Sequence, residues 1–175
     1  MKSLLVTALL AFSITTLSFA TNPNPEGPLP NADSTRLAEL DQFWATLSRT
    51  VREGDFEGYA ATYHPDAVVV FGFGKKPTSM PVARALKSWK QGFVNTAAGN
   101  QQDHVVFRFT QRIGDASTAH ETGMFVFTSA DEKGNEQSKY IAHFEMLLVK
   151  RDGQWKGVME YQKSEGTQAE WDALK

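Results

Sequence analysis

The chain has 175 residues, of which 41% are hydrophobic and 11% aromatic, and its formal net charge is −2. This length supports one domain with a sizeable core and is short for two. The near-neutral charge, without a long basic run, argues against a nucleic-acid partner and against electrostatic docking on a membrane. Cysteine is absent, which excludes disulfides, thiol catalysis and thiolate metal sites.

The first twenty residues have the pattern of a secretory signal peptide. Lys2 supplies a positive start, residues 4–17 are mostly apolar, and Ser18-Phe19-Ala20 is a small-x-small cleavage motif. A membrane anchor is the alternative, but this apolar stretch is shorter than the ~20 residues that span a bilayer. We therefore expect cleavage after Ala20 and a periplasmic or secreted protein, with no membrane contact after cleavage.

A proline-rich segment, residues 21–33, follows the cleavage site and has little to bury, which predicts an extended tether. The folded domain is expected over residues 34–175. It begins with a helix capped by Asp33 or Ser34, because apolar residues then repeat at three- and four-residue spacing until Gly54.

Two further helices and a strand are expected before the middle of the chain. A short helix fits residues 55–63 and is ended by Pro65. The β-branched and aromatic run of residues 67–73 predicts a buried strand. A third helix is expected over about 80–97, where apolar residues again repeat at helical spacing.

The hydrophobic period changes to two in the C-terminal half, and short turns separate four such runs. The runs are residues 104–113, 118–129, 139–151 and 154–163. Helices followed by an antiparallel meander make an α+β fold. A last helical turn or two is expected within 167–175.

This order of elements resembles the nuclear transport factor 2-like (NTF2-like) superfamily, in particular its small bacterial SnoaL-like and DUF4440-like members. The resemblance covers about residues 34–164 and rests also on Gly-Asp-Phe at 54–56, Pro-Asp-Ala at 65–67 and Asp-Gly-x-Trp at 152–155. It implies a cone, in which a curved antiparallel sheet wraps around the helices and encloses a pocket, and commonly a homodimer through the sheet. The superfamily contains isomerases, cyclases, epoxide hydrolases, dehydratases and proteins without catalysis, so function has to be argued from the site.

The last hairpin supplies the candidate catalytic residues. An Asp152-Gly153 turn pairs Arg151 with Gln154, and counting from there sets Glu145 directly opposite Glu160. If water covers both carboxylates, the pair is an ordinary surface feature. If the pair is buried, the two groups would share a proton, with His143 as a third member of a proton-transfer site.

Two other interpretations of the acidic pair remain open. His143, Glu145 and Glu160 could form a ligand set for a divalent metal, although their spacing is not diagnostic and we predict no metal. In a homodimer, an arginine of the second copy could instead balance the two carboxylates.

The other side of the hairpin is apolar and predicts a pocket for a small apolar or aromatic molecule, since such pockets combine apolar walls with a few polar groups. The predicted ligand-binding residues are Tyr59, Tyr63 and Trp89 from the helical side and Phe144, Met159 and Tyr161 from the hairpin.

Two functions therefore remain. The first is an exported protein that holds such a molecule without changing it. The second is a cofactor-independent isomerase, cyclase or dehydratase that uses His143, Glu145 or Glu160 as proton carrier. The ketosteroid isomerases of the superfamily use a carboxylate base near the end of the first strand, and residues 70–73 contain none. Nucleotide, haem and flavin motifs are absent, so no organic cofactor is expected.

Overall fold

The computed structural model describes residues 32–174, so the predicted signal peptide, residues 1–20, and nearly all of the predicted tether lie outside the described residues. The helices are α1 (Ala32–Glu53), α2 (Phe56–Ala60), α3 (Val82–Ala97) and α4 (Gln168–Ala173). The strands are β1 (Tyr63–Phe71), β2 (Thr78–Pro81), β3 (Gln101–Gly114), β4 (Thr118–Asp131), β5 (Glu136–Arg151) and β6 (Gln154–Glu165). None of the helices in this range is long and apolar enough to cross a membrane.

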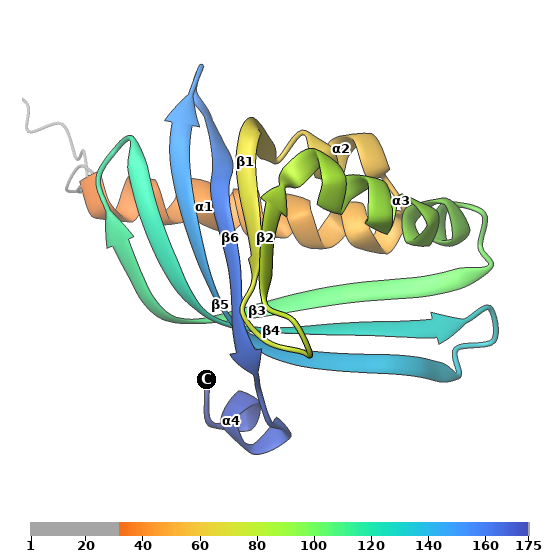
Figure 1. The fold of residues 1–175 in the computed structure, drawn as a ribbon. Helices are drawn as coiled ribbons and strands as arrows, with labels where there is room; N and C mark the ends of the chain where they lie inside the picture. The colour runs from red at the N-terminus through yellow and green to blue at the C-terminus, as the bar shows by residue number, and fades with distance from the viewer. Residues whose placement is uncertain (1–31, 175) are drawn as a thin grey trace, which may run out of the picture.

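The strands form a single sheet in the order β2-β1-β6-β5-β4-β3. The predicted meander from β3 to β6 is confirmed, with antiparallel pairing throughout. β1 extends this meander by pairing in parallel with β6, and β2 pairs antiparallel with β1. The long strands bend strongly, so the sheet curls toward the helices (Figure 1). The α+β class and the cone shape are therefore confirmed.

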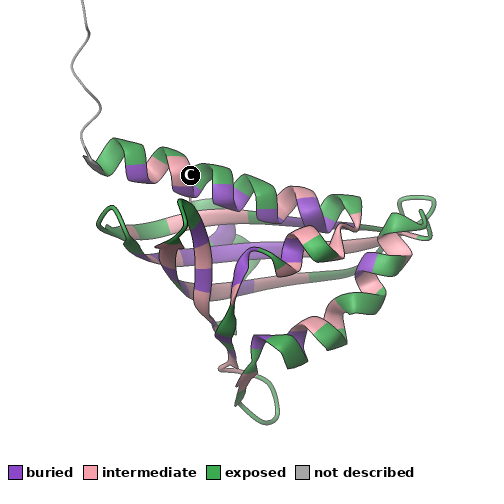
Figure 2. Cartoon of the chain, turned by 90° about the horizontal axis from the view of Figure 1, so that it is seen from above, coloured by how far each residue is buried: buried purple, intermediate pink, exposed green. Residues whose placement is uncertain are grey.

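The main core lies between this sheet and the first three helices. The predicted apolar positions of α1 are buried: Leu40, Phe43, Trp44, Leu47 and Val51 all belong to one core cluster. Figure 2 shows the buried residues of α1 on the side that faces the sheet. Gly54 ends α1 with a φ of +69°, and a side chain there would collide with the backbone of Ala97 at the end of α3. Only glycine therefore lets the ends of α1 and α3 approach this closely.

Several bounds differ from the sequence predictions, and one short strand was not predicted. α1 begins at Ala32, two residues inside the expected tether. α2 ends at Ala60, and Tyr63 already starts β1, which contains Pro65. The residue before a proline disfavours the helical conformation, so the chain leaves the helix earlier than predicted. β2 has only four residues and ends in a proline, which is why its pattern gave no strand signal.

The C-terminal helix α4 covers part of the opposite face of the sheet. Trp171 packs there with Met124 and Val126 in a second small core. The Arg108 guanidinium lies 4.2 Å from the centre of the Trp171 ring and donates hydrogen bonds to the carbonyl oxygens of Trp171 and Leu174. A capping box between Thr167 and Glu170 starts this helix. The predicted last helical turns are thus confirmed.

Candidate functional site

A cavity of about 370 Å³ lies between the helices and the concave side of the sheet. Eleven of its twenty lining residues are aromatic: Trp44, Tyr59, Tyr63, Phe71, Trp89, Phe93, Phe107, Phe125, Phe127, Tyr140 and Phe144. The other lining residues are Leu47, Val51, Gly92, Gln101, Asp103, Val105, Met146, Glu160 and Gln162. Every helix except α4 and every strand except β2 contributes to this wall.

The predicted pairing of Glu145 with Glu160 is wrong. The hairpin begins as expected, with positive φ at Asp152 and Gly153 and with Arg151 opposite Gln154. The register then shifts by one residue, because Leu148 pairs with Gly157 whereas Leu147 pairs with Met159. This β-bulge leaves Val158 without a partner residue and reverses the two faces of β6 beyond it.

The bulge decides which side chains of β6 face the cavity. Beyond it, Glu160 pairs with Met146, and Glu145 pairs with Tyr161. Glu160 and Gln162 line the cavity, whereas Met159 and Tyr161, which were predicted there, do not. Gly157 marked this place in the sequence, since a glycine within a strand indicates a bulge or a close backbone approach.

Gly157 also allows a close contact inside the cone. A Cβ atom at this position would lie 3.3 Å from the Tyr63 ring and 3.4 Å from the sulfur of Met146. The backbone amide of Gly157 donates to the carbonyl oxygen of Thr62. The bulge thus lies where the start of β1 pairs with β6, at Tyr63 and Gly157. Because the bulge turns Glu160 toward the cavity, the Tyr63 hydroxyl can donate to it.

Glu160 is the centre of a buried hydrogen-bond network. The Tyr63 hydroxyl donates to its Oε2 atom, and the Gln162 side-chain amide donates to Oε1 over 2.8 Å. The hydroxyl oxygens of Tyr59 and Tyr63 are 3.2 Å apart. Burial raises the pKa of the Glu160 carboxyl and outweighs these two hydrogen bonds, which lower it. Burial likewise raises the pKa of the Tyr63 hydroxyl.

A second carboxyl group, Asp103, lines the cavity at the start of β3 and is 6% exposed. The side-chain amide of Gln101 lies 2.7 Å from each of its oxygens. The sequence did not single out Asp103, because the register of this strand could not be fixed and the residue precedes the predicted strand. Tyr140 was also missed, although it lies within the predicted strand 139–151 on the same side as Phe144, so the period of two could have indicated it. Burial, with the nearby Glu165 and Glu160 carboxylates, raises the pKa of Tyr140 to about 12.

The three predicted catalytic residues do not converge. Only Glu160 faces the cavity. Glu145 lies on the outer face, 2.6 Å from the Lys163 amine and 3.1 Å from the His120 ring, and these two partners lower the pKa of its carboxyl. His143 lies 3.4 Å from the Glu170 carboxylate. The shared-proton and metal-ligand arrangements both require these groups to meet, so both are wrong as geometry. Within residues 32–174, no group of three or more His, Asp or Glu side chains is placed to hold a metal ion.

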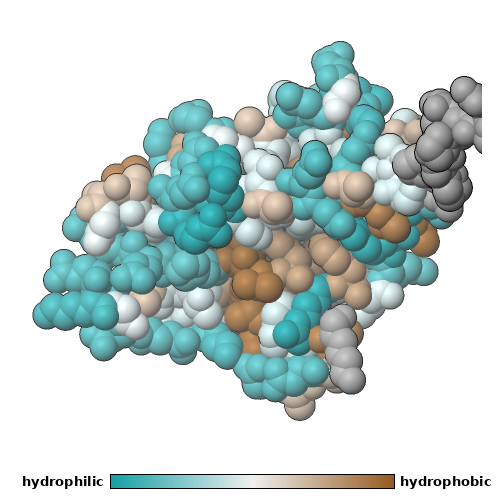
Figure 3. Space-filling model, turned by 180° about the vertical axis from the view of Figure 1, so that it is seen from behind, coloured by the Kyte–Doolittle hydropathy of each residue, from teal (hydrophilic) through white to brown (hydrophobic). Residues whose placement is uncertain are grey.

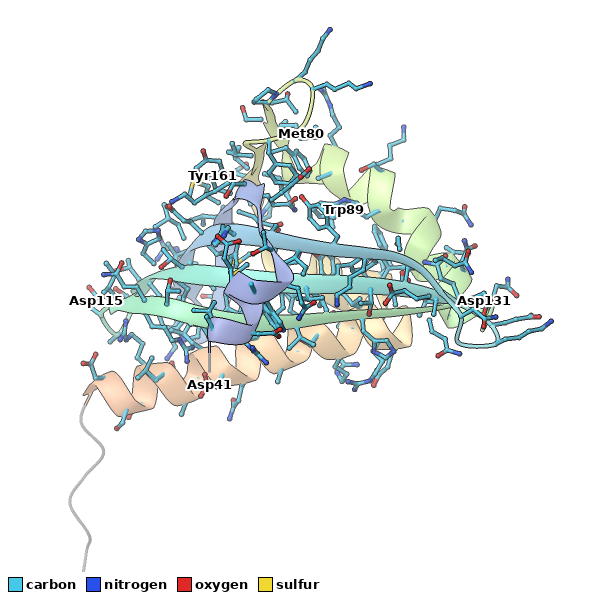
Figure 4. The ribbon with its side chains drawn as sticks, turned by 90° about the horizontal axis from the view of Figure 1, so that it is seen from below. Asp41, Met80, Trp89, Asp115, Asp131 and Tyr161 are labelled. Carbon is cyan, nitrogen blue, oxygen red and sulfur yellow. The ribbon has the colours of Figure 1, made fainter. Side chains whose placement is uncertain are left out.

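Four of the six predicted ligand-binding residues line the cavity: Tyr59, Tyr63, Trp89 and Phe144. Figure 4 shows Trp89 on the side of α3 that faces the sheet. Ligand binding itself remains a prediction for these residues.

A buried ion pair fixes one wall of the cavity. Glu121 is fully buried, and its Oε2 atom accepts hydrogen bonds from the Trp44 indole over 3.0 Å and from Arg112 over 2.7 Å. Arg112 also pairs with Asp41 of α1 over 2.6 Å. Trp44 therefore has its polar edge held by Glu121 while its ring faces the cavity.

Comparison with known proteins agrees with this fold. No curated protein has a sequence significantly similar to this one. A Mycobacterium tuberculosis protein of unknown function shares 17% identity with a TM-score of 0.59, over 82% of this chain and 80% of the other. The β subunit of the benzoate 1,2-dioxygenase of Burkholderia mallei shares 16% identity with a TM-score of 0.58, over 71% of this chain and 87% of the other.

An NTF2-like protein of unknown function from Shewanella oneidensis shares 13% identity with a TM-score of 0.57, over 72% of this chain and 97% of the other. These likenesses show the fold alone. The model of the SnoaL-like domain matches residues 33–158, which is most of the described range. The chain therefore belongs to the SnoaL-like family, within the NTF2-like superfamily.

Proposed function

We propose that this protein binds a small, predominantly aromatic molecule in the cavity of the cone. The aromatic wall of this cavity carries the proposal, because a concave apolar site with a few placed polar groups is the usual form of a small-molecule site. The polar groups are concentrated at two places, around Glu160 and around Asp103. They would orient a ligand that the aromatic rings hold by packing.

Filling the cavity tests this proposal. Gly92 lines it from the middle of α3, and a Cβ atom there would make only ordinary contacts, 3.5 Å or more from its neighbours. Gly92→Leu should therefore keep the helix and occupy part of the ligand volume. The matched control is Ala83→Leu, which adds the same side chain at an exposed position of the same helix.

Binding of naphthalene-based probes is measured by the quenching of Trp44 and Trp89, which both line the cavity. We expect saturable binding to the unchanged protein and to Ala83→Leu, and at least tenfold weaker binding to Gly92→Leu. Equal affinity for both variants would place the probe outside the cavity and count against the proposal.

A second function, acid–base catalysis, is favoured by the position of Glu160. Of the three predicted proton carriers, it alone lies in the cavity, and burial raises the pKa of its carboxyl group, as is common for residues that transfer protons. As a carboxylate, Glu160 would accept a proton from a carbon next to a carbonyl group, and Tyr63 is the neighbouring hydrogen-bond donor. Such a site would serve an isomerase, cyclase or dehydratase without a cofactor.

Deuterium exchange tests this second function. The exchange of the α-hydrogens of 2-tetralone in D₂O is followed by NMR with the protein present. We expect Glu160→Gln to abolish the catalysed exchange and Glu145→Gln, on the outer face, to leave it unchanged. Exchange that survives Glu160→Gln would show that this residue is not the proton carrier.

Export and dimerisation complete the proposal. The pattern of residues 1–20 supports export and cleavage after Ala20, which the N-terminal sequence of the protein recovered from a periplasmic fraction would test. Exposed apolar side chains on the outer face of the sheet, Val106, Ile113 and Leu147, support a homodimer through the sheet. Figure 3 shows an apolar area surrounded by polar surface on one face of the molecule.

A further inference from the structure

The charges around the cavity are all of one sign. Asp103 and Glu160 face it, and lysine, arginine and histidine are absent from its wall as far as the described residues go. We infer that the ligand is an organic cation, an amine attached to an apolar or aromatic body. This inference rests on the proposed ligand-binding function and specifies the chemical class of the ligand.

Within residues 32–174, the two cavity carboxyl groups have no cationic partner. Glu160 is 9% exposed and accepts hydrogen bonds from Tyr63 and Gln162, which are both uncharged. Asp103 is 6% exposed and accepts from the uncharged amide of Gln101. A buried carboxylate is normally paired with a cation, because the cost of removing it from water is otherwise large.

Glu121 is a buried carboxyl group with a structural role, and it can be compared with the two cavity carboxyl groups. It lies at the same side of the sheet, is fully buried, and pairs with Arg112 over 2.7 Å. The two cavity acids have polar partners but no such cation. The difference indicates that the balancing charge at the cavity comes from the ligand.

The aromatic rings of the wall favour the same ligand class. The planes of Tyr59 and Trp89 are inclined by 82° and those of Tyr59 and Phe93 by 47°, so ring faces and edges surround the space from several directions. The face of an aromatic ring carries partial negative charge and attracts an ammonium group, most strongly where water is excluded. An aromatic wall and two carboxyl groups therefore act together on a cation.

The same arrangement disfavours anionic ligands. A carboxylate or phosphate in this cavity would lie beside Asp103 and Glu160 without a basic side chain in the wall to balance it. Burying like charges together costs free energy, so the site selects against acids as well as in favour of amines.

Three probes with one naphthalene ring test this inference: naphthalen-2-ylmethylamine, naphthalen-2-ylmethanol and 2-naphthoate. Their affinities for the full chain are measured by isothermal titration calorimetry at pH 7. We expect the amine to bind at least about tenfold more tightly than the alcohol, and the carboxylate to bind most weakly. If the alcohol binds as tightly as the amine, the cavity binds ligands but the preference for a cation is wrong. If none of the three binds, the proposed binding function fails with it.

Amide variants locate the preference. Asp103→Asn and Glu160→Gln remove one charge each with little change of shape, and Glu132→Gln is the matched control on an exposed turn. We expect each cavity variant to weaken amine binding severalfold and to leave binding of the alcohol within twofold, which also reports that the cavity is intact. Glu132→Gln should change neither. A preference for the amine that persists in the double variant Asp103→Asn/Glu160→Gln would overturn the inference.

Discussion

Glu160 combines a buried carboxyl group with hydrogen-bond donors that only partly replace water. Because burial raises its pKa in the folded protein, the native state binds more protons than the unfolded chain between the unfolded value, about 4.3, and the raised value. Its contribution to stability is therefore fully present below the unfolded pKa and is lost as the pH rises through the folded pKa. The loss approaches about 1.4 kcal/mol for each unit by which the two values differ.

This linkage is tested by urea unfolding at several pH values between 4 and 8. The free energy of unfolding of the unchanged protein, relative to Glu160→Gln, should fall as the pH rises. Glu145 is the matched control with the opposite sign, because its partners lower its pKa. Relative to Glu145→Gln, the unchanged protein should gain stability as the pH rises from the lowered value to the unfolded value, about 4.3, so this pair is compared between about pH 3 and about pH 5. A difference from Glu160→Gln that does not vary with pH would contradict the raised pKa.

Tyr63 and Tyr161 permit a matched test of the two faces of the sheet. Tyr63 donates to Glu160 inside the cavity, whereas Tyr161 does not line the cavity. Tyr63→Phe leaves a buried carboxyl group with one donor fewer, so we expect a loss of about 1–3 kcal/mol in the free energy of unfolding. Tyr161→Phe should change it by less than about 0.5 kcal/mol. Equal effects in chemical denaturation would mean that the bulge does not separate these residues.

The residues of the site were only partly predictable, for a physical reason. Residue type and periodicity identified Tyr59, Tyr63, Trp89 and Phe144, because aromatic side chains are usual components of a pocket. Glu160 was identified by a count of register that proved wrong. The partners of these residues depend on register, and a single extra residue in β6 turned Glu160 toward the cavity, whereas Glu145 of β5 stayed on the outer face. Asp103 precedes the predicted strand, so its direction could not be derived.

At the scale of the elements, α3 holds a glycine in its interior and another just beyond its end. Gly92 lies within Val82–Ala97, whereas Gly99 has a φ of +75°. A helix interior favours alanine over glycine by about 1 kcal/mol, and the left-handed region favours glycine by about the same amount. Gly92→Ala should therefore raise the free energy of unfolding by about 0.5–1 kcal/mol, and Gly99→Ala should lower it by about 1 kcal/mol.

Guanidinium denaturation of the two variants measures whether the free energy of unfolding rises in Gly92→Ala and falls in Gly99→Ala. A Cβ atom at Gly99 meets nothing within 4 Å, so the expected loss there has no steric part. If Gly92→Ala destabilises the protein, the cavity wall at α3 is packed more tightly than the structure shows, because the nearest atom to the added carbon is 3.5 Å away.

Elements with a strong local signal were predicted well. The two-residue turn at Asp152-Gly153 and the apolar periodicity of α1 both depend only on residues that are close together in the chain. The hairpin and the helix could therefore be predicted directly from the sequence. The bulge and β2 depend on contacts between distant segments. β2 pairs only with β1, and the bulge lies where Gly157 meets Thr62 and Tyr63. Local patterns therefore contained no information on the partners of these two features.

At the scale of the whole molecule, the order of elements determines the cone. The helices come first in the chain and the meander follows, and bending of the long strands then closes the sheet over α1 and α3 (Figures 1 and 2). This arrangement leaves the outer face of the sheet partly covered. α4 packs on Met124 and Val126, whereas Ile113 and Leu147, which both pair with His120 on the neighbouring strand, stay exposed.

The exposed row of Ile113 and Leu147 gives the test of the proposed homodimer. Leu147 is 40% exposed beside Met159 of β6, so a second copy would bury an apolar strip at this point. Leu147→Lys would bury a charge without a partner there, and we expect at least a tenfold rise in the dissociation constant of the dimer. Val94→Lys, at a position in α3 that is 47% exposed and away from the outer face of the sheet, is the matched control and should leave the dimer intact. Sedimentation velocity at several concentrations distinguishes the outcomes. If the unsubstituted protein is monomeric at all concentrations, the proposed homodimer is wrong. The outer face of the sheet would then be exposed to solvent except where α4 covers it.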